Sequence, residues 1–436
     1  MSWLSLSTSA SNQATQPLLN TTRHVLPNGL VALIYRNPTT PTVSVRGRVA
    51  LGAAYEHAAK SGLAAFTAAT LIRGTQHRTF QQLVAETEER GCSVNAGGGM
   101  HSSSFGGKAL AEDLPLILDV LADMVKHPTF PSTEVEKLRG QFLTGLRESE
   151  EETRFQASRA LRKLLYPAEH PYSRLSSGSI ETVQALTRDD LVAFHQWYRP
   201  DLTTIAIVGD VQADQVIATL EQTFGDWQGN TSPPDLLWPA VLHIEQPQQR
   251  HITLAGKVQT DIIWAVHGLK RQDPAYYPAM VGNIILGRLG MGGRLSDAIR
   301  QEQGLAYYAS SSLDADVQAG PWAAGAGVNP AHVQRVIELL LHEIETFRQQ
   351  GPTAEELDDT KAFLTGSMAL RLEANDGIAA MLLGIEEFDL GLDYVVRYPA
   401  IIHDVTAEQV TDVARTYLST ERYVLATAGP DTAKAL

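Results

Sequence analysis

The chain has 436 residues, of which 44% are hydrophobic and 19% are charged, and its formal net charge at pH 7 is −14. This composition is typical of a globular protein with room for roughly two to four compact domains. The acidic balance argues against a nucleic-acid ligand, because phosphate binding needs clustered lysines and arginines. The single cysteine, Cys92, excludes an intramolecular disulfide and a thiolate metal cluster.

Targeting and membrane segments are not expected. No stretch approaches the roughly 20 apolar residues of a membrane span. The N-terminal stretch lacks the apolar core of a signal peptide and the arginines of a transit peptide. We therefore expect a cytoplasmic protein that binds neither a membrane nor a nucleic acid.

The first half of the chain predicts strands, then helices, then strands, then helices and a last strand. Strands are expected at His24–Leu26, Leu30–Tyr35 and Val43–Leu51, twice within Ser93–Gly107, and at Thr203–Val208. Helices are expected at Gly62–Arg73, Phe80–Arg90 and Leu114–Lys126, over a long stretch from Ser132 to about Leu165, and after the capping pair Thr187 and Asp190. This order predicts an α+β fold in which a sheet packs against helices.

The second half repeats the first at an offset of about 220 residues, which indicates a duplicated domain. The tetrapeptide Phe-Leu-Thr-Gly occurs at Phe142–Gly145 and again at Phe363–Gly366, and a second pair of similar segments aligns Thr187 with Thr406. Turn-forming residues between the halves predict a linker. The expected organisation is a flexible N-terminal segment at 1–22, a first domain at 23–228, a linker at 229–242 and a second domain at 243–436.

Four segments of the first half carry further signatures: Leu26–Leu30, Gly62–Thr75, His127–Pro131 and His170–Tyr172. Together they resemble the pitrilysin/insulinase family of zinc peptidases, and the similarity extends over nearly the whole chain. The resemblance implies two homologous sheet-plus-helices domains, similar to the halves of processing peptidases and of the metallopeptidase LuxS. It also implies that Gly62–Thr75 corresponds to the helix that carries the family's inverted zinc motif, His-x-x-Glu-His.

In that register the zinc motif is lost. The family's two histidine ligands correspond to Ala65 and Ala69, its general-base glutamate to Ala68, and its third ligand falls at or beside Gly145. A methyl group neither binds zinc nor takes a proton from bound water. No two of the 13 histidines are three or four positions apart, so no helix face presents a histidine pair. We expect no metal in this chain and no hydrolysis by the chain alone.

The second half retains a different motif. A glycine-rich loop containing Gly290, Gly292 and Gly293 precedes Arg-Leu, and Arg300 is followed seven residues later by Tyr307. The resemblance implies that these five residues bind substrate, with the arginine and the tyrosine holding the peptide backbone beside the zinc. Both side chains donate hydrogen bonds to a carbonyl oxygen or a developing oxyanion, and glycines let a chain pass close by.

Simpler explanations remain open for these positions. Arg300 can form a surface ion pair and Tyr307 can pack within a strand, and the family's glutamate after the arginine is Gln301 here. Asn95 and Ala96 match the edge strand that pairs with peptide in active family members. The glycines at 97–99 that follow predict that this strand is poorly formed.

The leading functional hypothesis is a non-catalytic, substrate-binding subunit of a heterodimeric zinc endopeptidase. Its partner would be a zinc-motif chain of similar length that holds the zinc, and its substrates would be peptides to be degraded or processed. Arg300 and Tyr307 would then act at the partner's active site. Two alternatives stay open: a catalytically dead scaffold subunit of a larger complex, and an active homodimeric peptidase with a metal site that the sequence does not reveal.

Overall fold

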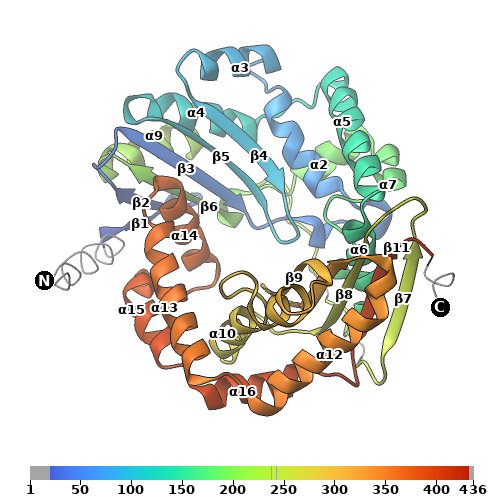
Figure 1. Cartoon of the computed structure of the whole chain (residues 1–436). Coiled ribbons are helices and arrows are strands. Elements are labelled where there is room, and N and C mark those ends of the chain that lie inside the picture. Colours follow the sequence, from blue (N-terminus) through green and yellow to red (C-terminus); the bar gives the residue numbers. More distant parts are fainter. Residues whose placement is uncertain (1–19, 237, 242, 432–436) are drawn as a thin grey trace, which may run out of the picture. The chain divides into compact units, whose positions relative to one another are not determined.

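The computed structural model describes residues 20–236, 238–241 and 243–431 (Figure 1). Two compact units make up this described part, and each of them is discontinuous in sequence. The first takes the described residues before 145 together with 175–236 and 368–397, and the second takes the remainder. Most of the predicted flexible segment 1–22 lies outside the described residues, and Thr22 already belongs to a strand.

The first unit contains a six-stranded sheet in the order β1-β2-β6-β3-β5-β4. Only β2 and β6 run parallel, and the other neighbours are antiparallel. The strands are β1 (Thr22–Val25), β2 (Val31–Arg36), β3 (Thr42–Val49), β4 (Ser93–Gly98), β5 (Ser103–Leu110) and β6 (Thr203–Gly209). The helices of this unit are α2 (Leu63–Thr70), α3 (Phe80–Glu88), α4 (Leu114–Lys126), α7 (Ile180–Ala185), α8 (Arg188–His195), α9 (Ala213–Phe224) and α14 (Asn375–Glu387).

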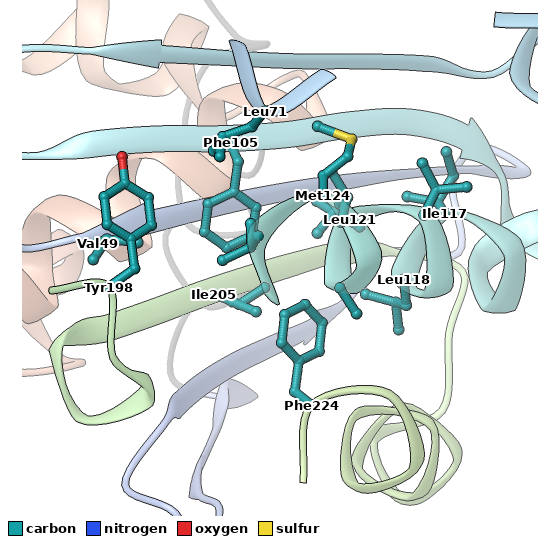
Figure 2. Close-up of a cluster of buried hydrophobic side chains, with 14 of the residues drawn as sticks. Val49, Leu71, Phe105, Ile117, Leu118, Leu121, Met124, Tyr198, Ile205 and Phe224 are labelled. Carbon is teal, nitrogen blue, oxygen red and sulfur yellow. The ribbon is translucent and has the colours of Figure 1, made fainter. Parts of the chain in front are cut away.

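The core of the first unit lies between its sheet and α4 (Figure 2). The helix has apolar residues three or four positions apart, so they form one continuous buried face. That face consists of Ile117, Leu118, Leu121 and Met124, all fully buried. Phe105 of β5 also belongs to this core, and its ring lies over Gly47 of β3. A Cβ on Gly47 would lie 2.1 Å from that ring, so the position needs a glycine.

The second unit contains a five-stranded sheet in the order β7-β11-β8-β10-β9. Its strands are β7 (Gln248–Thr253), β8 (Thr260–His267), β9 (Ala306–Ala315), β10 (Ala319–Val328) and β11 (Val424–Gly429). Its helices are α6 (Thr153–Leu165), α10 (Tyr276–Gly287), α11 (Gly293–Ser296), the π-helix η8 (Asp297–Gln301), α12 (Val333–Gln350) and α16 (Ala407–Tyr417). Three further helices span a boundary between the units: α5 (Ser132–Glu150), α13 (Ala354–Arg371) and α15 (Tyr394–His403).

The duplication and the α+β class predicted from the sequence are confirmed. Apart from β1, the two sheets have the same strand order, and each has one parallel pair, β2 with β6 and β7 with β11. The repeated sequence segments fall on corresponding elements. Thr187 and Thr406 both form capping boxes, at the start of α8 and of α16, and the two Phe-Leu-Thr-Gly segments lie on α5 and α13.

The two halves exchange one helix, which the sequence pattern does not predict. The helical stretch expected from Ser132 to Leu165 is broken at residues 151–152, and its second part, α6, packs on β8 and β11 of the second sheet. The corresponding helix of the second half, α14, packs on β3 and β6 of the first sheet. Each half of the sequence therefore supplies a helix that covers the other half's sheet.

Polar contacts fix α14 on its sheet. The Asp376 carboxylate accepts hydrogen bonds from Arg46 Nε at 2.8 Å, from an Arg46 terminal nitrogen at 2.6 Å and from the Ser44 hydroxyl at 3.1 Å. Further along the helix, Arg48 donates to Glu387 at 2.5 Å. The guanidinium of Arg46 holds the pKa of Asp376 at about 2, below its ordinary value of 3.8.

This pair predicts a pH-dependent contribution to stability. Because the folded-state pKa of Asp376 lies below that of the unfolded chain, the contribution is fully present above about pH 4 and is lost as the pH falls towards 2. Asp376→Asn should lower the free energy of unfolding by about 1 kcal/mol at pH 7, since partial exposure screens the pair. Urea unfolding from pH 7 to pH 2 should show the difference from wild type vanishing at the acid end. Asp358→Asn, at an exposed position of α13, is the control, and a pH-independent deficit for Asp376→Asn would contradict the assignment.

A buried carboxylate anchors the other exchanged helix. Asp261 of β8 is 1% exposed and accepts hydrogen bonds from Thr153, the first residue of α6, at 2.5 Å, from Gln259 at 3.0 Å and from the Tyr308 hydroxyl. Burial, followed by the bond to this carboxylate, raises the pKa of Tyr308. Hydrogen bonds to a charged acceptor are stronger than neutral ones, so this cluster fixes where α6 begins on the second sheet.

Candidate functional site: a metal-free helix and an arginine–tyrosine pair

The helix expected to correspond to the family's zinc helix is α2. It begins after Gly62, whose φ of 95° ends the preceding turn. The buried Glu56 carboxylate accepts hydrogen bonds from the backbone N–H groups of Gly62 at 2.8 Å and Ala64 at 2.9 Å. An acceptor for the unpaired N–H groups of a first turn stabilises a helix start. Glu56 is therefore committed to holding α2 in place.

The residues on this helix do not fit a zinc ion. Ala68 is fully buried, Ala65 and Ala69 are half-buried, and none of the three has an atom that can bind a metal. Gly145, at the position matched to the third ligand, is an exposed residue of α5. Among the described residues no group of three or more His, Cys, Asp or Glu side chains is arranged to hold a metal. No step of a reaction is therefore assigned to a metal in this chain.

The edge strand β4 is fully formed, which corrects the expectation from its glycines. All six residues from Ser93 to Gly98 pair in register with β5, including Asn95 and Ala96. Of these glycines, Gly98 is required by packing. A Cβ on Gly98 would lie 2.7 Å from the Ala64 carbonyl oxygen and equally close to the Ala65 Cα, so only glycine lets the strand lie this close to α2.

Arg300 and Tyr307 flank a tight connection between a helix and a strand. Arg300 lies near the end of η8, and Gly304, with φ of 66°, turns the chain towards β9, which η8 contacts. Arg300 is half-buried, and its guanidinium has no hydrogen-bond or ion-pair partner among the described residues. The Tyr307 ring is 66% exposed, and its hydroxyl likewise has no partner in the described part of the chain. Neither a surface ion pair nor packing inside the strand accounts for these two residues.

A β-bulge places Tyr307 outside the regular ladder. Ala306 pairs with Val328 and Tyr308 pairs with Gly327, so Tyr307 is the extra residue of β9 between two consecutive residues of β10. Bulges re-aim a side chain and are common next to binding sites. The sequence alone gave no indication of this bulge, because it depends on which residues of β10 lie opposite.

The glycine loop before η8 packs closely on its own unit. A Cβ on Gly293 would lie 2.4 Å from the Ile285 carbonyl oxygen, and one on Gly292 would lie 2.6 Å from the Ser296 Cβ. Both residues have a positive φ, which also favours glycine. Of the three loop glycines, Gly290 alone has open space where a side chain would be. Packing thus explains Gly292 and Gly293, and Gly290 is the one of the three with room for another chain beside it.

Arg294, which the sequence did not single out, anchors this loop. Its guanidinium forms two hydrogen bonds with the Glu356 carboxylate, at 2.5 and 2.6 Å, and one with the Gly351 carbonyl oxygen at 3.0 Å. It also lies over the Phe347 ring, 5.2 Å from the centroid. Although burial alone would raise the pKa of Glu356, the hydrogen bonds from Arg294 lower it. The two arginines of the motif therefore differ: Arg294 is bound to the Glu356 carboxylate, and the Arg300 guanidinium has no partner among the described residues.

In the part of the chain that the structure describes, no helix has the length and apolarity needed to cross a membrane. Two sheets of one topology and an exchanged helix in each half define a duplicated two-domain α+β protein. Residues 31–173 match the family model described as insulinase (peptidase family M16), and residues 185–364 match that of the peptidase M16 inactive domain. The chain belongs to this insulinase (M16) family.

Its relatives cover almost the whole chain. The uncharacterized zinc protease YmxG of Bacillus subtilis is 26% identical over 420 residues, which are 94% of this chain and 98% of that protein. The beta subunit of the mitochondrial-processing peptidase of Saccharomyces cerevisiae is 25% identical over 405 residues, 89% of this chain and 85% of that one. A crystal structure of a peptidase M16 inactive domain from Pseudomonas fluorescens superposes with a TM-score of 0.86 and 25% identity, covering 94% of this chain and 98% of that one.

Proposed function

We propose that this chain is the non-catalytic, substrate-binding subunit of a heterodimeric zinc endopeptidase that acts on peptides in the cytoplasm. The observation that carries the proposal is the pair Arg300 and Tyr307, whose donor groups have no partner among the described residues. They occur in a chain whose zinc-motif positions are alanines. Donors without protein partners beside an edge-strand bulge suit a ligand that arrives from another molecule.

In this proposal the zinc and the general base belong to a zinc-motif partner of similar length. The partner's site supplies the activated water. The contribution of this chain is to orient the substrate: the Arg300 guanidinium and the Tyr307 hydroxyl donate hydrogen bonds to the carbonyl oxygen of the peptide. These bonds strengthen as negative charge develops on that oxygen, which lowers the barrier to attack. The relative that is named as one subunit of a processing peptidase supports a role in an assembly.

Co-purification from a native lysate tests the proposal. The tagged full-length chain should recover a second chain of similar length that carries His-x-x-Glu-His, in a stoichiometric complex on size exclusion. Recovery within a large complex that contains no zinc-motif chain would instead favour the scaffold alternative. Recovery of this chain only with copies of itself would contradict the heterodimer.

A further inference from the structure

A cavity of about 520 Å³ lies within the second unit, between the exchanged helix α6 and the face of β8, β9 and β10. Its wall is unusually basic for a chain with a net charge of −14. Three arginines line it: Arg154 and Arg162 from α6, and Arg288 from the end of α10. Asp314 is the one carboxylate among the lining residues that the structure describes.

Among the described residues, only one of these arginines has an anionic partner. Arg162 approaches Asp314 to 3.8 Å, and its Nε is buried without a hydrogen-bond partner in the described part of the chain. The Arg154 guanidinium lies over the Tyr308 ring, 5.0 Å from the centroid, and no described residue forms an ion pair or hydrogen bond with it. For the exposed Arg288, the described residues offer neither an ion pair nor a hydrogen bond to its side chain. Two positive charges in excess therefore line one cavity.

The duplicated fold provides an internal comparison. The corresponding cavity of the first unit, about 280 Å³, lies between the exchanged helix α14 and the face of β3, β4 and β5. Each of its two arginines forms an ion pair with a carboxylate of α14: Arg46 with Asp376, and Arg48 with Glu387. The third basic residue of this lining, Lys108, also lies 3.7 Å from Asp376. Every basic residue is therefore paired in the first unit's cavity, whereas two of three are unpaired in the second. Neighbouring guanidinium groups repel one another where no anion lies between them, so the open cavity suits an anionic ligand.

We propose that the cavity of the second unit binds a carboxylate of a peptide. Guanidinium groups match the planar carboxylate and bind it with two parallel hydrogen bonds. The excess of two positive charges over the single carboxylate of Asp314 suits an anionic ligand. The lining also includes apolar side chains that can receive the residue next to the carboxylate: Leu161, Ile263, Pro321, Ala323 and Ala324.

This inference rests on the proposed function in one respect: that function makes the ligand a peptide substrate. The cavity would then recognise a carboxylate group of that substrate. The carboxylate has two sources, the C-terminus of a peptide or an acidic side chain. Both present the same planar anion, so the probes have to separate them. Binding is a property of this chain alone and needs no partner subunit.

Isothermal titration calorimetry on the isolated full-length chain tests the inference with three probes. Acetyl-tetra-alanine with a free C-terminal carboxylate and acetyl-Ala-Glu-Ala-Ala amide carry one carboxylate each, and acetyl-tetra-alanine amide carries none. At least one carboxylate peptide should bind and the uncharged amide should not. Which of the two carboxylate peptides binds identifies the source. Binding should weaken as salt rises, because the attraction is between charges.

The variants Arg162→Gln and Arg288→Gln should each weaken binding about tenfold or more, as the loss of a charged hydrogen bond predicts. The matched control is Arg250→Gln, an exposed arginine on β7 at the opposite edge of the sheet from β9. Arg288 is exposed, so its substitution should not disturb folding even if Arg162→Gln does, and melting temperatures check this.

Equal binding of all three peptides, no binding of any, or affinities unchanged in both variants would overturn the inference. Tighter binding of inorganic phosphate than of either carboxylate peptide would also overturn it, in favour of a general anion site. These outcomes are distinct from failure of the proposed function, which is measured by partner-dependent turnover. If the chain binds the carboxylate peptides but activates no partner, the inferred carboxylate site stands and the proposed role as a peptidase subunit is contradicted.

Discussion

Arg300→Ala should reduce peptide turnover by the assembled complex about a hundredfold while leaving assembly intact, since one donor to a developing oxyanion contributes on the order of that factor. The structure supports an effect on turnover and not on folding. The Arg300 guanidinium has no partner in the described residues whose loss would destabilise the unit. Tyr307→Phe removes only a hydroxyl from a ring that is 66% exposed, and should also lower turnover sharply.

The measurement combines size exclusion with turnover of a quenched fluorescent peptide, for each variant reconstituted with the zinc-motif partner. The loss should appear mainly in kcat, because a bond that forms only as charge develops stabilises the transition state more than the bound peptide. Arg250→Ala, at an exposed arginine of the second unit, is the control and should keep wild-type rates. Wild-type turnover by both variants in a fully assembled complex would refute the role of the pair and favour the scaffold alternative.

The second large effect concerns the exchanged helices. Fragments 23–228 and 243–436, expressed separately, should fail to fold cooperatively, and together they should reconstitute the native protein. The first fragment lacks α14, which covers β3 and β6, and the second lacks α6, which covers β8 and β11. Each sheet would then expose a face that is buried in the intact chain, and small domains have little stability to lose.

Circular dichroism and urea unfolding of each fragment, alone and mixed, measure this effect. A synthetic peptide of residues 150–167, which contains α6, should restore cooperative unfolding to the second fragment when it is added in excess. A scrambled peptide of the same composition is the control. Cooperative two-state unfolding of both isolated fragments would show that the exchange contributes little to stability.

Local patterns predicted much of the fold. The helix expected at Leu114–Lys126 has those bounds in the structure, because its apolar spacing is regular. The pairing of Thr187 with Thr406 identified two capping boxes at corresponding helices, since a capping residue acts within its own helix. The family resemblance placed the zinc-motif positions on a helix, where the structure has them on α2.

Features that depend on tertiary contacts were not predictable in this way. Both α5 and α6 have helical periodicity, and nothing in that periodicity tells which sheet α6 will cover. The bulge at Tyr307 depends on its pairing with β10. The basic cavity brings together Arg154, Arg162 and Arg288 from segments more than a hundred residues apart, and the difference between Arg294 and Arg300 appears only when Glu356 is placed beside the former.

The central claim, that this chain supplies substrate-binding groups and no catalytic metal, is tested most directly by comparing three samples. These are the purified chain, the zinc-motif partner and their equimolar mixture, each assayed for hydrolysis of a quenched peptide and for zinc by elemental analysis. The chain alone should contain no stoichiometric zinc and cleave nothing, and the mixture should turn over far faster than the partner alone. About one tightly bound zinc per chain, with chelator-sensitive hydrolysis by this chain alone, would contradict the claim, as would a partner whose turnover is unchanged by adding it.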